Sequence, residues 1–293
     1  MTLRHFKIFI MVCETMNMTQ AAERLYVSQS AVSQAVSDLE GHYGTRLFER
    51  LSKRIYLTNA GERLLSYARH IIQLTEEAEV SMNSLWERGL IRIGASVTVG
   101  SAILPRLVSE FKHISPSVEI QVIEDNTTVI ESLIMKNEVD LGLVEGEIVS
   151  PDIYITPFLK DELILISGAE HPFSKKPLIQ PQELEHENFI IREMGSGTRM
   201  LFEVKMAANH VNWSASWECN NSETIKNAVE HSLGLSVISE KSVLRELKNK
   251  TLFSSKIDGI EFFREFKIAY HKNKYLTEKM NQLIQHLITK YKA

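Results

Sequence analysis

The sequence predicts an α domain followed by an α/β module: helical N-terminal residues, a long helix, and a larger part that folds as two α/β lobes. Three observations predict this order. Apolar residues recur at helical spacing through the first 58 residues. A proline-free helical pattern then covers residues 59–87. From residue 90 onward, short apolar strand-like runs alternate with amphipathic helical segments.

Size and composition are those of an ordinary soluble protein with two or three domains, since 44% of the 293 residues are hydrophobic and 24% are charged. Cys13 and Cys219 lie in apolar stretches, so we expect buried thiols rather than a disulfide framework. The N-terminus carries Arg4 and Lys7 and lacks a small-residue cleavage site, which argues against a signal peptide. No apolar run reaches the length of a bilayer. We therefore expect a cytoplasmic protein without a membrane partner.

The net charge of −4 is unevenly distributed along the chain. Residues 1–70 contain 9 basic and 6 acidic side chains, whereas the remainder contains 24 basic and 31 acidic ones. A basic N-terminal part on an acidic remainder indicates that the first part meets a polyanion.

Two short helices are expected within residues 19–43. Thr19 is expected to cap the first, over about residues 20–26, and Ser28 the second. The inward face of the second helix is expected to hold Val32, Ala35, Val36 and Leu39. Its opposite face carries short uncharged polar side chains: Gln29, Ser30, Ser33, Gln34 and Ser37.

This arrangement is typical of a helix-turn-helix unit whose second helix enters the major groove of double-stranded DNA. Short hydroxyls donate to or accept from base edges, and Gln pairs with adenine, whereas long acidic side chains would be repelled by phosphates. The exposed amides at the start of the helix also favour a phosphate. A helix that merely faces water explains the absence of Glu and Lys poorly.

The segment "LFERLSKRIYLT" predicts a β-hairpin with basic residues near its tip, at Arg50, Lys53 and Arg54. Such a wing would hold phosphates or reach into the minor groove. A solvated run of charges is the alternative.

Residues 59–88 are expected to form a linker helix that starts after Thr58. Its apolar positions recur at helical spacing: Leu64, Leu65, Ala68, Ile71, Ile72, Leu74 and Ala78. A second copy of the same helix in a homodimer is one partner for this stripe, and the chain's own domains are the other. The N-terminal domain is accordingly placed at residues 1–58.

The α/β module is expected at residues 89–293. Strands are expected at 90–95, 117–124, 139–146, 161–169, 188–193, 214–220, 234–239 and 262–272. Helices are expected at 101–114, 127–137, 197–210, 223–232 and 278–292. This alternation indicates parallel strands with right-handed crossovers. We place lobe I at about 89–161 and 267–293, and lobe II at about 162–266.

Three stretches rich in small polar residues follow strands and precede helices. The first contains Ser96 and Thr98 as capping hydroxyls, and the third contains Asn221. The second runs through Gly195, Ser196, Gly197 and Thr198. Ligands of open α/β sheets lie beyond the carboxyl ends of the strands, where helix N-termini attract anions. A small anion such as carboxylate, phosphate, sulfate or sulfite is therefore predicted, unless these residues only cap their helices.

The N-terminal motifs resemble those of LysR-type transcriptional regulators. The matching positions are Ala21, Ala22, Leu25, Ser28, Gln29, Ser30, Ala31, Ser33, Leu39, Glu40, Gly44, Leu47, Phe48, Arg50, Leu57, Thr58, Ala60 and Gly61, while Tyr43 departs from the usual Leu. The resemblance covers the chain and implies a winged helix-turn-helix, a dimerising linker helix and an effector domain like type II periplasmic binding proteins. It implies a homotetramer, and it leaves RNA polymerase as a possible further partner.

In this family the inducer lies between the lobes, which implies roles for Ser96, Thr98 and the loop 196–198. The stretch "REMGSGTR" is similar to regulators of carbon fixation and of sulfite or cysteine assimilation. Arg192 and Arg199 in this stretch either neutralise an anion or form ordinary ion pairs. Glu145, on the expected rim, would disfavour a second negative charge if it pointed inward.

An enzyme would need a nucleophile with a base or a metal site, and the ten histidines show no such spacing. We therefore expect neither catalysis, nor a metal, nor a cofactor other than a small anionic effector. A solute-binding protein would not need the N-terminal domain. The remaining alternative is a DNA-binding regulator whose C-terminal domain serves assembly alone.

Overall fold

The computed structural model describes residues 1–51, 54–83 and 89–291 and divides into two compact units. The first consists of the N-terminal part together with Met135–Asn137 and Asn273–Tyr275, and the second holds most of the residues from 89 onward. The first unit contains α1 (Leu3–Thr15), α2 (Met18–Arg24), α3 (Gln29–Tyr43), β1 (Phe48–Leu51), β2 (Arg54–Leu57) and α4 (Asn59–Asn83). Its core gathers apolar side chains from α1, α2, α3, the hairpin and the first half of α4, with Phe9 and Leu39 fully buried. No helix within the described ranges combines the length and the apolar character needed to span a bilayer.

The prediction that Thr19 caps the first short helix is wrong. Asn17 is the cap of α2, since its side-chain oxygen accepts from the backbone amides of Thr19 (2.9 Å) and Gln20 (3.2 Å). Asn is as good a cap as Thr, and it occurs here two residues earlier. Thr19 is therefore an exposed residue inside the first turn of α2.

The structure confirms the expected start and inner face of α3. Ser28 is its N-cap and accepts from the amide of Ala31 at 3.2 Å. All four expected inward positions of α3 are buried: Val32, Ala35, Val36 and Leu39. Glu40 then ties the helix to the hairpin, because its carboxylate accepts from the amides of Leu47 (2.8 Å) and Phe48 (3.2 Å).

Thr58 begins α4 as expected, with its hydroxyl accepting from the amide of Gly61 at 3.0 Å. The residues expected to continue the helix beyond Asn83, residues 84–88, lie outside the described residues. The apolar stripe of α4 is divided between two surroundings. Leu64, Leu65, Ala68 and Ile72 pack into the core of the first unit. Ile71 and Leu74 remain 37% and 46% exposed, and Ala78 is exposed as well.

The second unit has two lobes. Lobe I contains β3 (Leu90–Ser96), α5 (Val97–Ala102), α6 (Leu104–Ile114), β4 (Glu119–Asp125), α7 (Thr127–Met135), β5 (Leu141–Val144) and α11 (Glu278–Tyr291). Lobe II contains β7 (Leu178–Ile179), β8 (Asn188–Arg192), α8 (Gly197–Ala208), β9 (Ser214–Cys219), α9 (Ser222–Glu230), β10 (Ser236–Ser239), α10 (Leu244–Asn249) and β11 (Leu252–Ile257). Three short 3-10 helices lie at Pro172–Lys175, Pro181–Leu184 and Glu240–Ser242.

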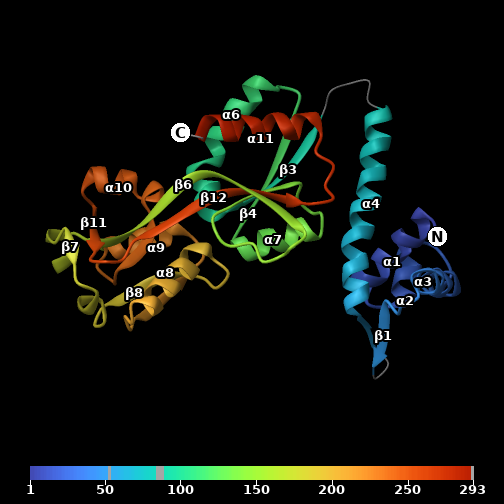
Figure 1. Ribbon diagram of the computed structural model, residues 1–293, viewed down its shortest axis with the longest axis horizontal. Helices are drawn as coiled ribbons and strands as arrows, with labels where there is room; N and C mark the ends of the chain where they lie inside the picture. Colours follow the sequence, from blue (N-terminus) through green and yellow to red (C-terminus); the bar gives the residue numbers. More distant parts are fainter. Residues whose placement is uncertain (52–53, 84–88, 292–293) are drawn as a thin grey trace. The chain divides into compact units, whose positions relative to one another are not determined.

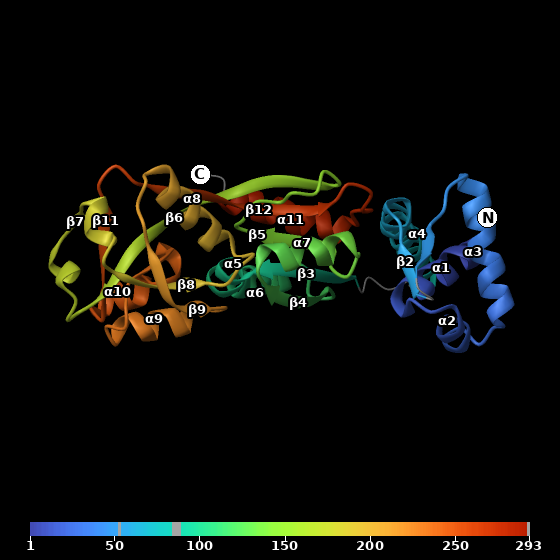
Figure 2. The same ribbon diagram turned by 90° about the horizontal axis from the view of Figure 1, so that it is seen from below.

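Two long antiparallel strands, β6 (Ile153–Gly168) and β12 (Phe262–His271), run through both lobes (Figure 1). Their side chains enter the cores of both lobes. Phe158 and Phe266 belong to the core of lobe I, whereas Leu163 and Phe262 belong to that of lobe II. Figure 2 shows α7 in the lobe with β3 and β4, and α9 and α10 in the other. The two strands therefore form the hinge region of the unit.

The expectation of parallel strands holds for part of the fold. The order β4-β3-β5 is parallel, and so is the pair β8-β9. By contrast, β12 runs antiparallel to β5 and β6, and β10 and β11 run antiparallel to β6. The sequence pattern also missed the first eight residues of β6, the short strands β7 and β11, and the break at Ile103 that separates α5 from α6.

Both cysteines are free thiols, as expected. Burial raises the pKa of Cys13 to about 12, with Arg69 acting in the opposite direction, and burial also raises the pKa of Cys219. Neither thiol is in an environment that favours the reactive thiolate.

Candidate functional site

The outer face of α3 is the first candidate surface. Gln29, Ser30, Gln34 and Ser37 are exposed on it, and Ser33 is half-buried. The Oγ atoms of Ser28 and Ser30 lie 2.9 Å apart. The side-chain amide of Gln34 donates to Asp38 at 2.8 Å, and this hydrogen bond lowers the pKa of Asp38. Among the described residues, Gln29, Ser33 and Ser37 have no side-chain partner, so their polar groups are available to another molecule.

The hairpin β1–β2 is present as expected, with Arg50 opposite Ile55 in its register. Arg54 is exposed on β2. Lys53 lies outside the described residues, and for Arg50 the structure describes the backbone. Within the described part of the wing, Arg54 is therefore an exposed cation.

The second candidate site lies between the two lobes, where Ser96 and Thr98 meet Glu145. The prediction that these two hydroxyls cap a helix is wrong. Ser96 precedes α5 but makes no side-chain cap bond; its hydroxyl donates instead to the carboxylate of Glu145. Thr98 donates to the other oxygen of the same carboxylate at 3.0 Å. A carboxylate is the stronger acceptor, and Glu145, at the end of β5, brings it within reach.

Arg264 on β12 joins the lobes at this point. Its Nη1 donates to Thr198 of lobe II at 2.9 Å, and its Nη2 donates to Thr98 of lobe I at 3.3 Å. Its Nε donates to Asp161 on β6 at 2.8 Å. The guanidinium therefore contacts both lobes. It also joins the two hinge strands, because Arg264 belongs to β12 and donates to Asp161 on β6.

The charges of this site are almost completely buried. The side chain of Arg264 is 6% exposed, that of Asp161 is 0% exposed and that of Glu145 is 2% exposed. Arg264 lies 2.8 Å from Asp161 and 3.7 Å from Glu145. One cation therefore faces two carboxylates in a region of low dielectric, where unpaired charge is costly.

The glycine-rich stretch before α8 lies against lobe I. Gly195 has a φ of +87°, which favours glycine, and its carbonyl accepts from Thr128 of α7 at 3.4 Å. A Cβ at Gly197 would lie 2.4 Å from the Cα of Gly146, so this contact between the lobes requires glycine. Ser196 is 2% exposed, and its hydroxyl has no hydrogen-bond partner among the described residues.

Asn221 is not part of this group. It caps α9, accepting from the amide of Thr224 at 2.8 Å, and it lines a separate cavity of about 410 Å³ between α5 and lobe II. Glu124 borders the same cavity, and its burial raises its pKa. The structure therefore brings two of the three predicted stretches to Arg264, while the third shares its cavity with Val97 of the first.

The two arginines of "REMGSGTR" are ion-pair partners in this structure. Arg192 is buried and donates to Glu193 at 2.8 and 2.9 Å. Arg199 donates to Glu203 at 2.7 Å and also to Glu218. Both guanidinium groups are thus already neutralised within lobe II.

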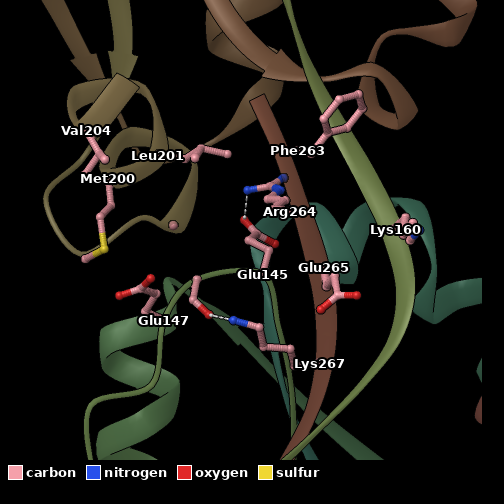
Figure 3. Close-up of a pocket in the computed structure, with 12 residues that line it drawn as sticks. Glu145, Glu147, Lys160, Met200, Leu201, Val204, Phe263, Arg264, Glu265 and Lys267 are labelled. Carbon is pink, nitrogen blue, oxygen red and sulfur yellow. Dashed lines mark hydrogen bonds and ion pairs between the residues drawn. The ribbon is translucent and has the colours of Figure 1, made fainter. Parts of the chain in front are cut away.

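A pocket of about 690 Å³ opens beside the buried charges, and we call it the interlobe pocket (Figure 3). Its lining residues come from both lobes and both hinge strands: Glu145, Gly146, Glu147, Lys160, Gly197, Met200, Leu201, Val204, Phe263, Arg264, Glu265 and Lys267. Met200, Leu201 and Val204 form an apolar wall on α8. Lys267 donates to the carbonyl of Gly146 at 3.3 Å. The pocket thus combines an apolar wall with cations and carboxylates.

Sequence reasoning missed Arg264, Asp161, Lys160 and Lys267. The alternating pattern of "FFREFKIA" contains a signal, since Arg264 falls on the same side of the strand as Phe262 and Phe266, which are buried. A charged residue in a buried row of a strand is unusual and indicates a partner. Within the described residues, no group of acidic, His and Cys side chains is arranged to hold a metal ion.

Two family models match the chain. The model described as "Bacterial regulatory helix-turn-helix protein, lysR family" matches residues 3–62, and "LysR substrate binding domain" matches residues 87–292. The chain is 32% identical to the HTH-type transcriptional regulator YeiE of Escherichia coli K12, over 97% of this chain and 96% of that one. It is also 32% identical to a "Probable RuBisCO transcriptional regulator" of Thalassiosira pseudonana, over 91% and 90% of the two chains.

Among solved structures, the regulatory domain of CcmR from Synechocystis PCC6803, in complex with 2-PG, matches with a TM-score of 0.66 and 28% identity. The match covers 70% of this chain and 98% of that one. These matches confirm the winged helix-turn-helix and the two-lobed effector domain, and they support the resemblance to carbon-fixation regulators. The chain therefore belongs to the LysR family and is a DNA-binding transcriptional regulator.

Proposed function

We propose that this regulator responds to a small anionic effector that binds between the lobes at Arg264. The observation that carries the proposal is the guanidinium itself, which donates to Thr98 of lobe I and to Thr198 of lobe II. A ligand that binds this cation would change the hydrogen bonds that link Arg264 to the two lobes. Its binding energy would then favour one interlobe arrangement over another, which is what a regulatory ligand requires.

Three further features support an anion at this place. The start of α8, a helix of 12 residues, lies beside the interlobe pocket and favours negative charge. The hydroxyl of Ser196, at that helix start, is without a described partner. Lys160 and Lys267 add two cations to the pocket wall. The proposed ligand-binding residues are Ser96, Thr98, Gly195, Ser196, Gly197, Thr198 and Arg264, and Glu145 lines the same site.

The CcmR regulatory domain was solved with 2-PG bound. This favours a ligand-binding role for the domain over the alternative, in which it serves assembly alone. We propose that no other cofactor is required.

For DNA, we propose that α3 reads base edges and that the wing holds phosphates. The supporting observation is the separation of residue types: the outer face of α3 is uncharged up to Asp38, while the described wing residue Arg54 is an exposed cation. The proposed contacts are Thr19, Ser28, Gln29, Ser30, Ser33, Gln34 and Ser37 from the helices, and Arg50, Lys53 and Arg54 from the wing. We propose that residues 1–58 form this DNA-binding domain.

We propose that α4 pairs with its copy in a homodimer. Tyr67, Ile71, Leu74 and Ala78 are exposed and succeed one another at spacings of four, three and four residues. That is the spacing of a coiled-coil seam, and it is distinct from the positions that pack on the chain's own core. Residues 59–88 would then be the dimerisation helix, and residues 89–293 the effector domain.

Pairs of dimers would form a homotetramer on two half-sites, and ligand-induced movement of the lobes would change the DNA bend. The protein would act in the cytoplasm, where its DNA is, with RNA polymerase as a further contact. The test is a titration of the full chain on its operator with sulfate, sulfite, phosphate, bicarbonate and 2-PG, read by footprinting and bend angle. A footprint and bend that none of these anions alters would refute the proposed response.

A further inference from the structure

The carboxylate of Glu145 accepts from the hydroxyl donors that lie between the lobes. Ser96 donates to one of its oxygens and Thr98 to the other, and Arg264 lies 3.7 Å away. We propose that Glu145 is an internal competitor for the anionic effector, which the ligand must displace to bind. This inference rests on the proposed function, because it concerns the same site.

Arg264 does not depend on Glu145 for neutralisation. Its closer partner is Asp161, at 2.8 Å, and Asp161 is itself fixed by the hydroxyl of Ser239 at 2.7 Å. Glu145 therefore adds a second buried carboxylate to a cation that is already paired. Burial removes both carboxylates from water, which costs free energy for each of them, and a single cation is present to offset this cost. A purely stabilising role leaves this excess of negative charge unexplained.

A cation is not the missing partner, because both oxygens of Glu145 already accept from hydroxyl groups. What the site offers is donors: two hydroxyls and the guanidinium. An incoming group that reproduces the two oxygens of the carboxylate satisfies the same donors without changing the net charge, provided that Glu145 moves into solvent. A ligand carboxylate meets this condition, and phosphate offers the same oxygens with additional negative charge, whereas a halide offers one acceptor atom in place of two oxygens.

Glu145 has a route away from the donors. It lines the interlobe pocket together with Gly146 and Glu147, and Glu147 is exposed. Figure 3 shows Glu145 beside Arg264 among the residues that line the pocket. The pocket, at about 690 Å³, has room for a displaced side chain together with a small ligand. Exchange of one carboxylate for another therefore needs no opening of the hinge strands.

The experiment compares the full-length wild type with Glu145→Gln and Glu145→Ala by calorimetric titration with phosphate, acetate, chloride and 2-PG. Glu147→Gln is the matched control, since it removes the same charge from the same pocket without touching the donors. Removing the buried competitor should tighten phosphate, acetate or 2-PG binding at least about tenfold, because a buried like charge no longer opposes the ligand. The control should change affinity less than threefold, and chloride should bind more weakly than phosphate or acetate.

If the wild type binds the anions and both Glu145 variants bind them equally or more weakly, the role of Glu145 as a competitor is refuted. The proposal of an anionic effector would still stand. Absence of binding to every variant, each shown to be folded by circular dichroism, would overturn the anionic effector as well. A crystal structure of the wild type with a bound anion gives a test that needs no variant. There the Glu145 carboxylate must have left Ser96 and Thr98; if it still accepts from both hydroxyls, the inference is refuted.

Discussion

Replacing Arg264 with leucine should destabilise the effector domain strongly. The substitution leaves Asp161 and Glu145 buried, at 0% and 2% side-chain exposure, with no other cation paired to them among the described residues. Breaking a buried ion pair by removing one partner costs about 3–5 kcal/mol. For a domain of roughly 200 residues, each kcal/mol shifts the midpoint by about 2–4 °C. The expected loss is therefore about 6–20 °C in Tm.

Thermal unfolding of the full chain can be followed by tryptophan fluorescence, because Trp213 and Trp217 both lie in lobe II. The matched control is Arg245→Leu. Arg245 also pairs with a glutamate, Glu246, but its side chain is 76% exposed, so its loss should shift the midpoint by under about 3 °C.

The cause of the loss can be separated from a packing defect. If unpaired carboxylates are responsible, adding Asp161→Asn and Glu145→Gln to Arg264→Leu should recover much of the lost stability. A triple variant as unstable as Arg264→Leu alone, or a single variant that melts like the wild type, would refute the electrostatic reasoning.

Three other predictions test the remaining parts of the molecule. Gln29→Ala should reduce the preference for operator over random DNA in binding assays, whereas Arg54→Ala should weaken both about equally and lower the salt slope by about one; identical effects would count against this division. Leu74→Glu should weaken self-association at least tenfold by sedimentation equilibrium, and an unchanged dimer would place the interface elsewhere. Hydrogen bonds from Lys290 and Arg106 lower the pKa of Glu110 to about 2, so its stabilising contribution is present above about pH 4.5 and lost as the pH falls towards 2. The Tm difference between wild type and Glu110→Gln should therefore be larger at pH 7 than at pH 3, and a constant difference would be inconsistent with this assignment.

The N-terminal unit was predictable because its signals are local. Ser28 caps α3 three residues from the amide it accepts, and Val32, Val36 and Leu39 face inward because they recur at the helical period. The one error there was also local: Asn17 offered an equally good cap two residues before Thr19. Local chemistry can decide such features because the interacting groups are a few residues apart.

The two-lobed layout was likewise predictable from the alternation of strands and helices, but the chemistry between the lobes was not. Arg264 meets Thr98 across 166 residues of sequence and Asp161 across 103. The sequence pattern predicted that backbone amides at helix N-termini would bind the anion. The tertiary structure shows in addition that the hydroxyls of Ser96 and Thr98 donate to the carboxylate of Glu145.

By itself, then, the sequence determined most of the helices, the wing and the two-lobed layout, since periodicity and capping act over a single turn or strand, and its N-terminal motifs indicated the family. Which charges are buried together, and which of them face the pocket, was decided by the packing of β6 and β12 between the lobes. Only this packing brings residues so distant in the chain within hydrogen-bond distance.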